Sequence, residues 1–329
     1  MARALVIGGT RFLGRHTVSE LLEAGYDVTT FNRGNHPDPF ADDDRVTWVE
    51  GDRTNDSALE AAAQRVDPSI VIDVVAYYPR DVRAATTIFA DVDAYVYVSS
   101  GAVYAEETVP KREGETALVP CGPKEATDDG METYGARKAE GDRAVFAAAA
   151  EGVPAMSVRP CIIYGPYDYT ERVDYWLDRI ATDDRVLVPG DGQHLWHRVY
   201  VKDVARALRI VAELGTPGEA YNVGDRRVLT LADWIERSAD VMDRDIEIVT
   251  AGPRELAAGG LDPTDFVLYR EYPHLLETAK LAALGWESTP VADALRATVA
   301  EHRESDRDGA DHDPGREAAD QVLEILDTL

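Results

Sequence analysis

The sequence predicts an α/β protein with a Rossmann-type, doubly wound parallel sheet and a smaller C-terminal substrate lobe. Two observations support this fold class. Apolar runs of strand length alternate with helical stretches through the first half of the chain, and a glycine-rich turn, Gly8–Gly14, follows the first run. Strands that alternate with helices form parallel sheets covered on both faces, and such sheets bind ligands at the carboxyl ends of their strands.

Each expected element follows from this alternation. The expected strands lie near residues 4–7, 27–31, 46–49, 70–75, 94–98 and 155–159. Continuous apolar runs of this length are typical of strands that are buried on both faces. The helices between them are expected near 56–65 and 80–90, with a further helix that carries Tyr134 and Lys138. Later elements are expected as helices at 170–182, 201–214 and 230–243 and strands at 185–188 and 219–223.

The pattern also suggests how the chain is divided. We expect a cofactor-binding domain over residues 1–166 with returns from about 196–225, a smaller interleaved lobe over 167–300, and a charged linker and terminal helix over 301–329. The charged segment 303–316 is typical of a solvated linker. The terminal helix has an apolar face that either docks on the core or makes a subunit contact in a homodimer. Its residues are Val322, Leu323, Ile325, Leu326 and Leu329.

The glycine-rich turn predicts a dinucleotide-binding site. Glycines after a first strand allow a tight turn and let the backbone approach a pyrophosphate, which binds at the amide groups and positive dipole of the next helix. An ordinary strand-to-helix turn is the alternative, since such motifs occur by chance. The expected contacts are Gly8, Thr10, Arg11, Phe12, Leu13 and Gly14.

The end of the second strand favours NADP over NAD. An acidic residue about 20 positions after the loop would bind the ribose hydroxyls of NAD, but this chain has Asn32 and Arg33 there, and Arg11 lies within the loop. Guanidinium groups suit a 2′-phosphate better than a bare ribose. Alternatively, Arg33 is simply solvated. Further cofactor contacts are expected from residues at other strand ends, namely Asp52, Arg53, Ala76, Tyr77 and Pro160.

Composition narrows the class of protein. The chain has 329 residues and a formal net charge of −27, and only five of its 34 basic residues are lysines. Such an acidic excess repels itself at low salt and is screened at molar salt, which predicts a cytoplasmic protein of a salt-accumulating halophile; a merely acidic mesophilic protein is the alternative. The charge disfavours nucleic-acid binding. No apolar segment of membrane-spanning length and no signal peptide is expected, and Cys121 and Cys161 predict no disulfide framework.

Several motifs together resemble one family. The chain is similar to extended short-chain dehydrogenases/reductases of the NAD-dependent epimerase/dehydratase superfamily over roughly residues 3–300. One branch, the chloroplast stem-loop RNA-binding proteins, shares the glycine turn, Asn32-Arg33-Gly34 and the stretch 76–82. The motifs that carry the likeness are Gly8–Gly14, Gly51-Asp52, Ser100-x-x-Val103-Tyr104, Tyr134-x-x-x-Lys138, Arg159-Pro160, Tyr164-Gly165-Pro166, the stretch 199–205, Tyr221-Asn222-Val223-Gly224 and Leu284-Gly285-Trp286.

The resemblance implies a catalytic site. Tyr134 is expected to exchange a proton with the substrate oxygen, and Ser100 to bind and orient the same oxygen. A phenol with a pKa near 10 is poorly matched to neutral pH; Lys138, one helical turn further, brings a positive charge that lowers this pKa, and in the family it also holds the nicotinamide ribose. Taken alone, Tyr-x-x-x-Lys is better explained by two residues on a helix surface.

Departures from the family pattern limit the expected substrate. Gly101-Ala102 replaces the Asp-Glu that 4,6-dehydratases use, and Ile162 replaces a substrate-binding asparagine. Trp196-His197 stands where sugar-nucleotide enzymes have Arg-Asp, so the substrate need not be a nucleotide sugar. His194 and His197 lack a third ligand at suitable spacing, and no metal site is expected.

Three functions compete at this point. The first is an NAD(P)-dependent oxidoreductase or epimerase that acts on a sugar or sugar derivative. The second is a non-catalytic or RNA-binding relative that keeps the fold. The third is a cofactor-sensing regulatory protein, which no motif favours. The sequence does not decide whether the hydride is lost to the substrate, as in a reductase, or returned, as in an epimerase.

Overall fold

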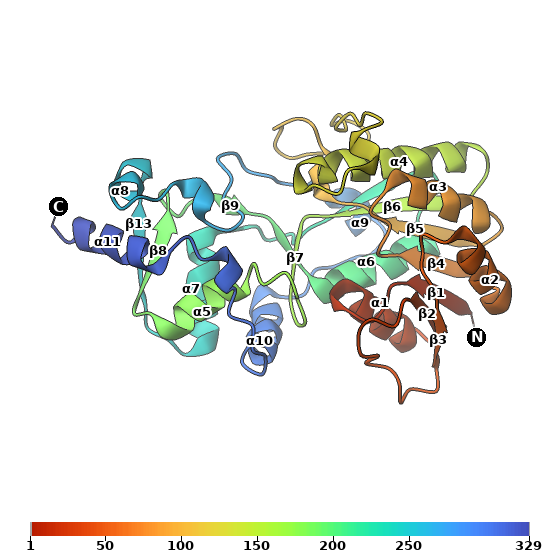
Figure 1. The fold of residues 1–329 in the computed structure, drawn as a ribbon, viewed down its shortest axis with the longest axis horizontal. Helices are drawn as coiled ribbons and strands as arrows, with labels where there is room; N and C mark the ends of the chain where they lie inside the picture. Colours follow the sequence, from red (N-terminus) through yellow and green to blue (C-terminus); the bar gives the residue numbers. More distant parts are fainter. Residues whose placement is uncertain (1, 329) are drawn as a thin grey trace. The chain divides into compact units, whose positions relative to one another are not determined.

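Two compact units make up the chain in the computed structural model, which describes residues 2–328 (Figure 1). The first unit contains the described residues up to Ile163 together with Val199–Gly224 and Leu276–Ser288. The second contains Tyr164–Arg198, Asp225–Leu275 and the residues from Thr289 onward. Each unit therefore combines stretches that are distant in the sequence.

A seven-stranded parallel sheet forms the first unit and confirms the predicted fold class. The strand order is β11-β6-β5-β4-β1-β2-β3, so the order reverses between β1 and β4, where open α/β sheets bind their ligands. The strands are β1 (Arg3–Ile7), β2 (Asp27–Asn32), β3 (Val46–Glu50), β4 (Ile70–Asp73), β5 (Ala94–Val98), β6 (Ala155–Pro160) and β11 (Ala220–Val223).

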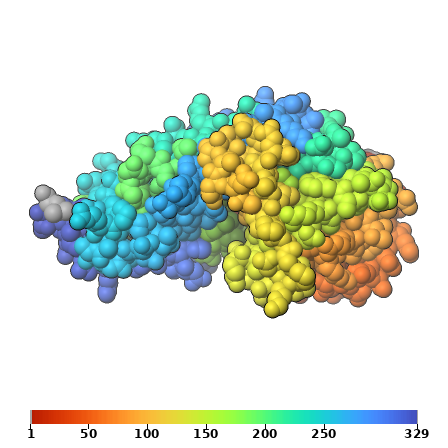
Figure 2. Space-filling view, turned by 90° about the horizontal axis from the view of Figure 1, so that it is seen from above, coloured from red at the N-terminus to blue at the C-terminus, as the bar shows by residue number. Residues whose placement is uncertain are grey.

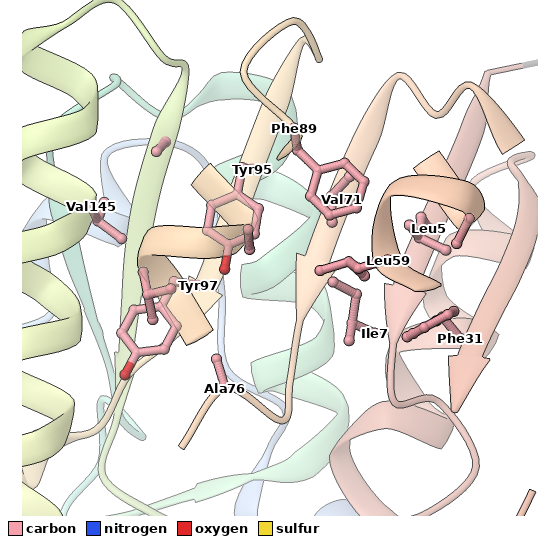
Figure 3. Close-up of a cluster of buried hydrophobic side chains, with 14 of the residues drawn as sticks. Leu5, Ile7, Phe31, Leu59, Val71, Ala76, Phe89, Tyr95, Tyr97 and Val145 are labelled. Atoms are coloured by element: carbon pink, nitrogen blue, oxygen red, sulfur yellow. The ribbon is translucent and has the colours of Figure 1, made fainter. Parts of the chain in front are cut away.

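Helices cover both faces of this sheet. Helices α1 and α6 pack against each other, and α3 packs against α2 and α4. The helices are α1 (Phe12–Glu23), α2 (Asp56–Val66), α3 (Pro79–Ile88), α4 (Tyr134–Ala150), α6 (Val201–Leu214) and α9 (Ala279–Ala282). One core cluster contains Leu5 and Ile7 from β1, Leu59 from α2 and Val145 from α4 (Figure 3). Alternate residues of β1 thus point to this face, as strand geometry requires.

Local signals define the helix ends. The Asn55 side chain accepts a hydrogen bond from the Ala58 amide at the start of α2, and Pro79 occupies the first turn of α3. Both features are favoured at helix N-termini, where backbone amides lack partners within the helix. Between Ser100 and α4, residues 104–133 form an irregular surface segment, drawn in yellow beside the yellow-green helix in Figure 2.

The second unit is smaller and has its own aromatic core. Strands β8 (Arg185–Pro189) and β13 (Glu247–Ala251) pair in parallel, and β9 (Leu195–Trp196) pairs with β12 (Leu229–Thr230). Trp176, Trp196, Trp234 and Phe266 make ring contacts in its interior. Its helices are α5 (Asp174–Thr182), α7 (Leu231–Met242), α8 (Pro253–Ala258), α10 (Val291–His302) and α11 (Arg316–Leu326).

The C-terminal region packs on this second unit. Helix α11 contacts α8, and Val322 is fully buried, so this part of the apolar face docks on its own chain. Leu323, Ile325 and Leu326 are partly buried, and Leu329 lies outside the described residues. The segment 303–316, expected as a solvated linker, is instead held by ion pairs: Arg307 binds Glu301 and Asp174, and Arg316 binds Asp183. Composition alone did not predict these ion pairs, because the partner residues lie outside the segment. Asp174 is in α5, Glu301 is in α10, and Asp183 follows α5.

None of the helices in the described part of the chain is long and apolar enough to span a bilayer.

Candidate active site

The turn between β1 and α1 has the geometry of an anion cradle. Gly8 and Gly9 adopt φ angles of +112° and +104°, a region that side chains disfavour. A Cβ on Gly14 would lie 2.6 Å from the Gly9 amide nitrogen, so only glycine fits there. Arg11 precedes α1, and its side chain makes no capping hydrogen bond to the helix. Backbone amides at such a helix start bind phosphate groups.

The remaining turn residues divide by exposure. Phe12 and Leu13 are buried in the core, Thr10 is half-buried and Arg11 is exposed. Arg11 Nη1 lies 3.3 Å from His36 Nε2. Of these four side chains, Arg11 is therefore the one placed to meet a charged ligand group.

Asn32 at the end of β2 acts within the protein. Its Oδ1 accepts hydrogen bonds from the Gly34 amide (2.9 Å) and Trp48 Nε1 (3.2 Å), while its Nδ2 donates to the Gly8 carbonyl (3.4 Å). The side chain therefore joins the end of β2 to the glycine turn and shapes the loop that carries Arg33, which is exposed. Trp48 belongs to β3 and is 45% exposed, so an indole lies beside the predicted cofactor residues.

Asp52 and Arg53 follow β3 but face different environments. Asp52 is exposed, and hydrogen bonds from the amide and hydroxyl of Thr54 hold the pKa of its carboxyl below the usual value. The Arg53 side chain is buried and bonded to the Asp73 carboxylate and the Asp81 carbonyl. Arg53 was predicted as a cofactor contact, yet its guanidinium is directed into the protein interior.

Ser100, Tyr134 and Lys138 come from adjacent segments. Ser100 follows β5, and its Oγ accepts a hydrogen bond from the Ala102 amide (3.1 Å). A Cβ on Gly135 would lie 2.5 Å from the Ala102 carbonyl oxygen, so glycine at this position lets α4 approach the segment after Ser100. Tyr134 begins this helix and is half-buried. The start of α4, which carries Tyr134, therefore lies against the segment that follows Ser100.

Lys138 is fixed in the interior below Tyr134. Its Nζ donates to the carbonyls of Ala76 (2.8 Å) and Val98 (2.9 Å) and lies 5.8 Å from the centre of the Tyr134 ring. Burial lowers the pKa of Lys138 to about 8, against the opposing effect of Asp73 and Asp142. The two hydrogen bonds orient the ammonium, and near neutral pH this protonated form is only weakly favoured over the neutral amine. Such a shifted pKa is expected of a group that influences proton transfer at a neighbouring residue.

The other predicted contacts lie at the same end of the sheet. Ala76 and Tyr77 follow β4, and Pro160 ends β6. Ala76 and Pro160 are buried, while Tyr77 is 41% exposed, with its ring centre 5.1 Å from Lys138 Nζ. Sequence reasoning missed Asp73 and the Val98 carbonyl. The signal for Asp73 was present, since a carboxylate ends a strand that is otherwise wholly apolar.

His194 and His197 lie in the second unit. His197 Nε2 is 3.1 Å from the Asp225 carbonyl, and burial lowers the pKa of this imidazole to about 4, so it is neutral at pH 7. Among the described residues, no group of three or more His, Cys, Asp or Glu side chains is arranged to hold a metal ion.

The family follows from residues 4–224, which match the model of the NAD dependent epimerase/dehydratase family. This range contains every residue of the candidate site. The chain belongs to the NAD dependent epimerase/dehydratase family. The predicted membership in the extended short-chain dehydrogenase/reductase superfamily is confirmed, and with it the prediction that the chain is of an enzyme class that uses nicotinamide cofactors.

Individual members of the family are similar at low identity. The chloroplast stem-loop binding protein of 41 kDa b from Arabidopsis thaliana is 24% identical over 270 residues, which cover 78% of this chain and 68% of the relative. The low-salt glycan biosynthesis protein Agl12 from Haloferax volcanii is 26% identical over 325 residues, covering 90% and 96%. The structure of dTDP-glucose 4,6-dehydratase from Bacillus anthracis in complex with NAD is 20% identical with a TM-score of 0.73, covering 95% and 100%. This structural likeness shows the shared fold.

Proposed function

We propose that the protein is an NAD(P)-dependent oxidoreductase or epimerase that acts on a sugar or sugar derivative through Ser100, Tyr134 and Lys138. The observation that carries the proposal is the placement of Lys138, buried and bonded to two carbonyls one helical turn from Tyr134. A sugar-related substrate is supported by the relative named for glycan biosynthesis, which matches most of the chain.

The residues have distinct roles in this proposal. Tyr134 gives a proton to the substrate oxygen or takes one from it, and the positive charge of Lys138 stabilises the phenolate form of Tyr134. Ser100 donates a hydrogen bond to the same oxygen. A bound nicotinamide supplies or accepts the hydride, and all proton movements belong to the chain's own groups. General acid–base catalysis of this kind typically contributes about 10²–10⁴-fold to a rate.

The turn after β1 fits a dinucleotide. Gly8, Gly9 and Gly14 let the turn pack closely, because a Cβ there would collide with Val74, Thr30 and the Gly9 backbone, and the Arg11 side chain makes no capping hydrogen bond at the start of α1. The amides of this turn would hold the pyrophosphate, Asp52 and Tyr77 at the ends of β3 and β4 would contribute further contacts, and Lys138 would bind the nicotinamide ribose. Arg11 and Arg33 would bind a 2′-phosphate, which supports NADP as the preferred cofactor.

Mass spectrometry of nucleotide released from protein purified at high KCl tests the proposal. Retained cofactor together with isomerisation of a sugar derivative would identify an epimerase, because an epimerase regenerates its cofactor in every turnover. Exchangeable cofactor with net reduction of a carbonyl would identify a reductase. Absence of both binding and turnover across NAD(H) and NADP(H) would contradict the assignment.

A substitution tests the NADP preference. Arg33→Ala is expected to weaken NADP(H) binding about tenfold or more, because charge-assisted hydrogen bonds contribute about 1.5–3 kcal/mol. NAD(H) binding should change little. Titration of both cofactors in molar KCl measures the effect, and the indole of Trp48, bonded to Asn32, provides a nearby fluorescence signal.

Arg65→Ala is the matched control, since Arg65 is an exposed arginine in the last turn of α2. This variant should leave the affinity for both cofactors unchanged. Equal affinity of the unmodified protein for NAD(H) and NADP(H), or equal loss for both in Arg33→Ala, would contradict the 2′-phosphate assignment and leave the fold untouched.

RNA binding is the second candidate, favoured by the likeness to a chloroplast stem-loop binding protein. The net charge of −27 opposes it, because affinity for nucleic acids comes mainly from neutralising phosphates. Filter binding of a stem-loop RNA at 50 mM KCl, where phosphate attraction is strong, distinguishes the two functions.

The acidic composition supports a further part of the proposal, that the protein works in the cytoplasm of a salt-accumulating organism. Its thermal midpoint is expected to rise by several degrees or more between 0.1 M and 2 M KCl, because the Debye length shrinks from about 10 Å to below about 3 Å and self-repulsion is screened. Melting curves followed by circular dichroism measure this. A midpoint that stays constant over this range would reject the high-salt habitat.

A further inference from the structure

A buried charge cluster lies beneath the candidate active site. Asp73 at the end of β4 is 0% exposed, Arg53 is 7% exposed and Asp81 in α3 is 3% exposed. The Arg53 guanidinium bonds to the Asp73 carboxylate, and its Nη1 lies 3.3 Å from both the carboxylate and the carbonyl of Asp81. Charged side chains are costly to bury, so we expect this cluster at the end of the sheet to have a function.

Hydrogen bonds connect Asp73 to the catalytic lysine. Asp73 Oδ1 accepts from the Val75 amide (3.2 Å), which closes the turn after β4. The next residue in that turn is Ala76, whose carbonyl accepts from Lys138 Nζ. Tyr95 Oη donates to Asp73 Oδ2 (3.2 Å) from the neighbouring strand β5. Ala76, Tyr95 and Tyr97 belong to one core cluster (Figure 3).

Electrostatics points to the same connection. Arg53 lies between the carboxylates of Asp73 and Asp81, and Asp81 has a second cation in Arg80, whose Nη1 lies 3.7 Å from its carboxylate. Asp73 is the largest influence opposing the effect of burial on the pKa of Lys138, and Asp142 is the next. The other groups around the ammonium are Arg137 and Tyr134 on α4, Tyr97 on β5, Tyr77 after β4 and the more distant Arg53.

We infer that Asp73, held by Arg53, is a positioning residue for Lys138: it fixes the turn that presents the Ala76 carbonyl and supplies the negative charge that keeps the ammonium protonated. The inference rests on the proposed function only for its consequence in catalysis. The link between Asp73 and Lys138 concerns the protonation state of Lys138, which can be measured without substrate.

The composition of the chain makes this measurement direct. The chain has five lysines, Lys111, Lys124, Lys138, Lys202 and Lys280, so ¹³Cε-labelled lysine gives few NMR signals, and the signal lost in Lys138→Arg identifies Lys138. Asp73→Asn removes the charge but keeps an oxygen that can accept from Val75. We expect the pKa of Lys138 to fall by about one pH unit in this variant, the lower end of the effect of a nearby opposite charge.

Asp81→Asn is the matched control. Asp81 is also buried and pairs with the same arginine, but its carboxylate bonds to the Tyr78 amide at the start of α3 and not to the Val75 amide that precedes Ala76. If the carboxylates only stabilise the fold, the two variants should behave alike. The inference requires that the Lys138 titration moves in Asp73→Asn and stays in place in Asp81→Asn; equal shifts in both, or none in Asp73→Asn, overturn it.

Activity provides the second measurement. In Asp73→Asn, the alkaline fall of kcat should move to lower pH together with the lysine titration, whereas a loss of folded protein would lower the rate at every pH. If Asp73→Asn does not fold, Arg53→Lys tests the same link, because a shorter cation should loosen Asp73 and again move the Lys138 titration. If the Lys138 titration in folded Arg53→Lys is the same as in the unmodified protein, the inference is contradicted. Full activity in a Tyr134 variant would contradict the proposed catalysis alone.

Discussion

Tyr134→Phe is expected to lower kcat/KM by about 10²–10⁴-fold, the usual contribution of a general acid–base group. The substitution keeps the aromatic ring and removes only the exchangeable proton, so the start of α4 and the contact of Gly135 with Ala102 should persist. Cofactor affinity and thermal stability should therefore change little. Steady-state kinetics on an identified substrate, with cofactor titration in parallel, measure the separate effects.

Three further variants define the site around this result. Lys138→Met should lose both activity and cofactor affinity, since its ammonium serves the tyrosine and the ribose. Ser100→Ala should be milder, because the serine orients the oxygen without carrying the transferred proton. Tyr97→Phe is the control: it removes a second phenol near Lys138, with a ring centre 5.0 Å from Nζ, but one that is fully buried, and it should stay within a few-fold. Full activity in Tyr134→Phe would place the chemistry elsewhere.

The first unit could be predicted well because its signals are local. The central strands β1, β4 and β5 are short apolar runs, and burial on both faces makes such runs distinctive. Gly8, Gly9 and Gly14 were recognisable because the backbone conformation and close contacts there exclude side chains. Tyr134 and Lys138 were recognisable by their spacing on one helix. The expected strand at 70–75 ends instead at Asp73, whose carboxylate accepts from the Val75 amide and turns the chain.

Other features depend on partners that are distant in the sequence. Arg53 was expected to contact the cofactor at a strand end, and its burial follows from Asp73 and Asp81, which belong to two other elements. Asn32 appeared available to a ligand, yet Trp48 and Gly8 use its side chain. In the second unit, β13 was missed because its residues are only partly buried and its pairing with β8 is long-range. Such pairings are set by packing, which periodicity does not report.

A second large effect is expected for the buried ion pair between Arg159 on β6 and Asp142, which lies about one helical turn after Lys138 on α4. Arg159 Nε donates to Asp142 Oδ2 (2.8 Å), and Arg159 Nη1 donates to Tyr104 Oη (2.9 Å). Both charged residues are essentially inaccessible to water. Arg159→Met leaves the Asp142 carboxylate buried with Ser157 as its remaining side-chain donor. Removal of one partner from a buried pair typically costs about 3–5 kcal/mol, a large part of a total near 5–15 kcal/mol.

Urea unfolding in molar KCl measures this loss, and two variants show its origin. Asp142→Asn combined with Arg159→Met should recover much of the stability, because the main cost lies in the unpaired charge and not in the lost contact. Arg83→Met breaks a pair to the same helix, Arg83–Glu140 at 2.5 Å, in which the arginine side chain is 55% exposed; exposed pairs contribute about 0–1 kcal/mol. If Arg159→Met lost no more stability than Arg83→Met, burial would not be what makes the Asp142–Arg159 pair important for the stability of the fold around α4.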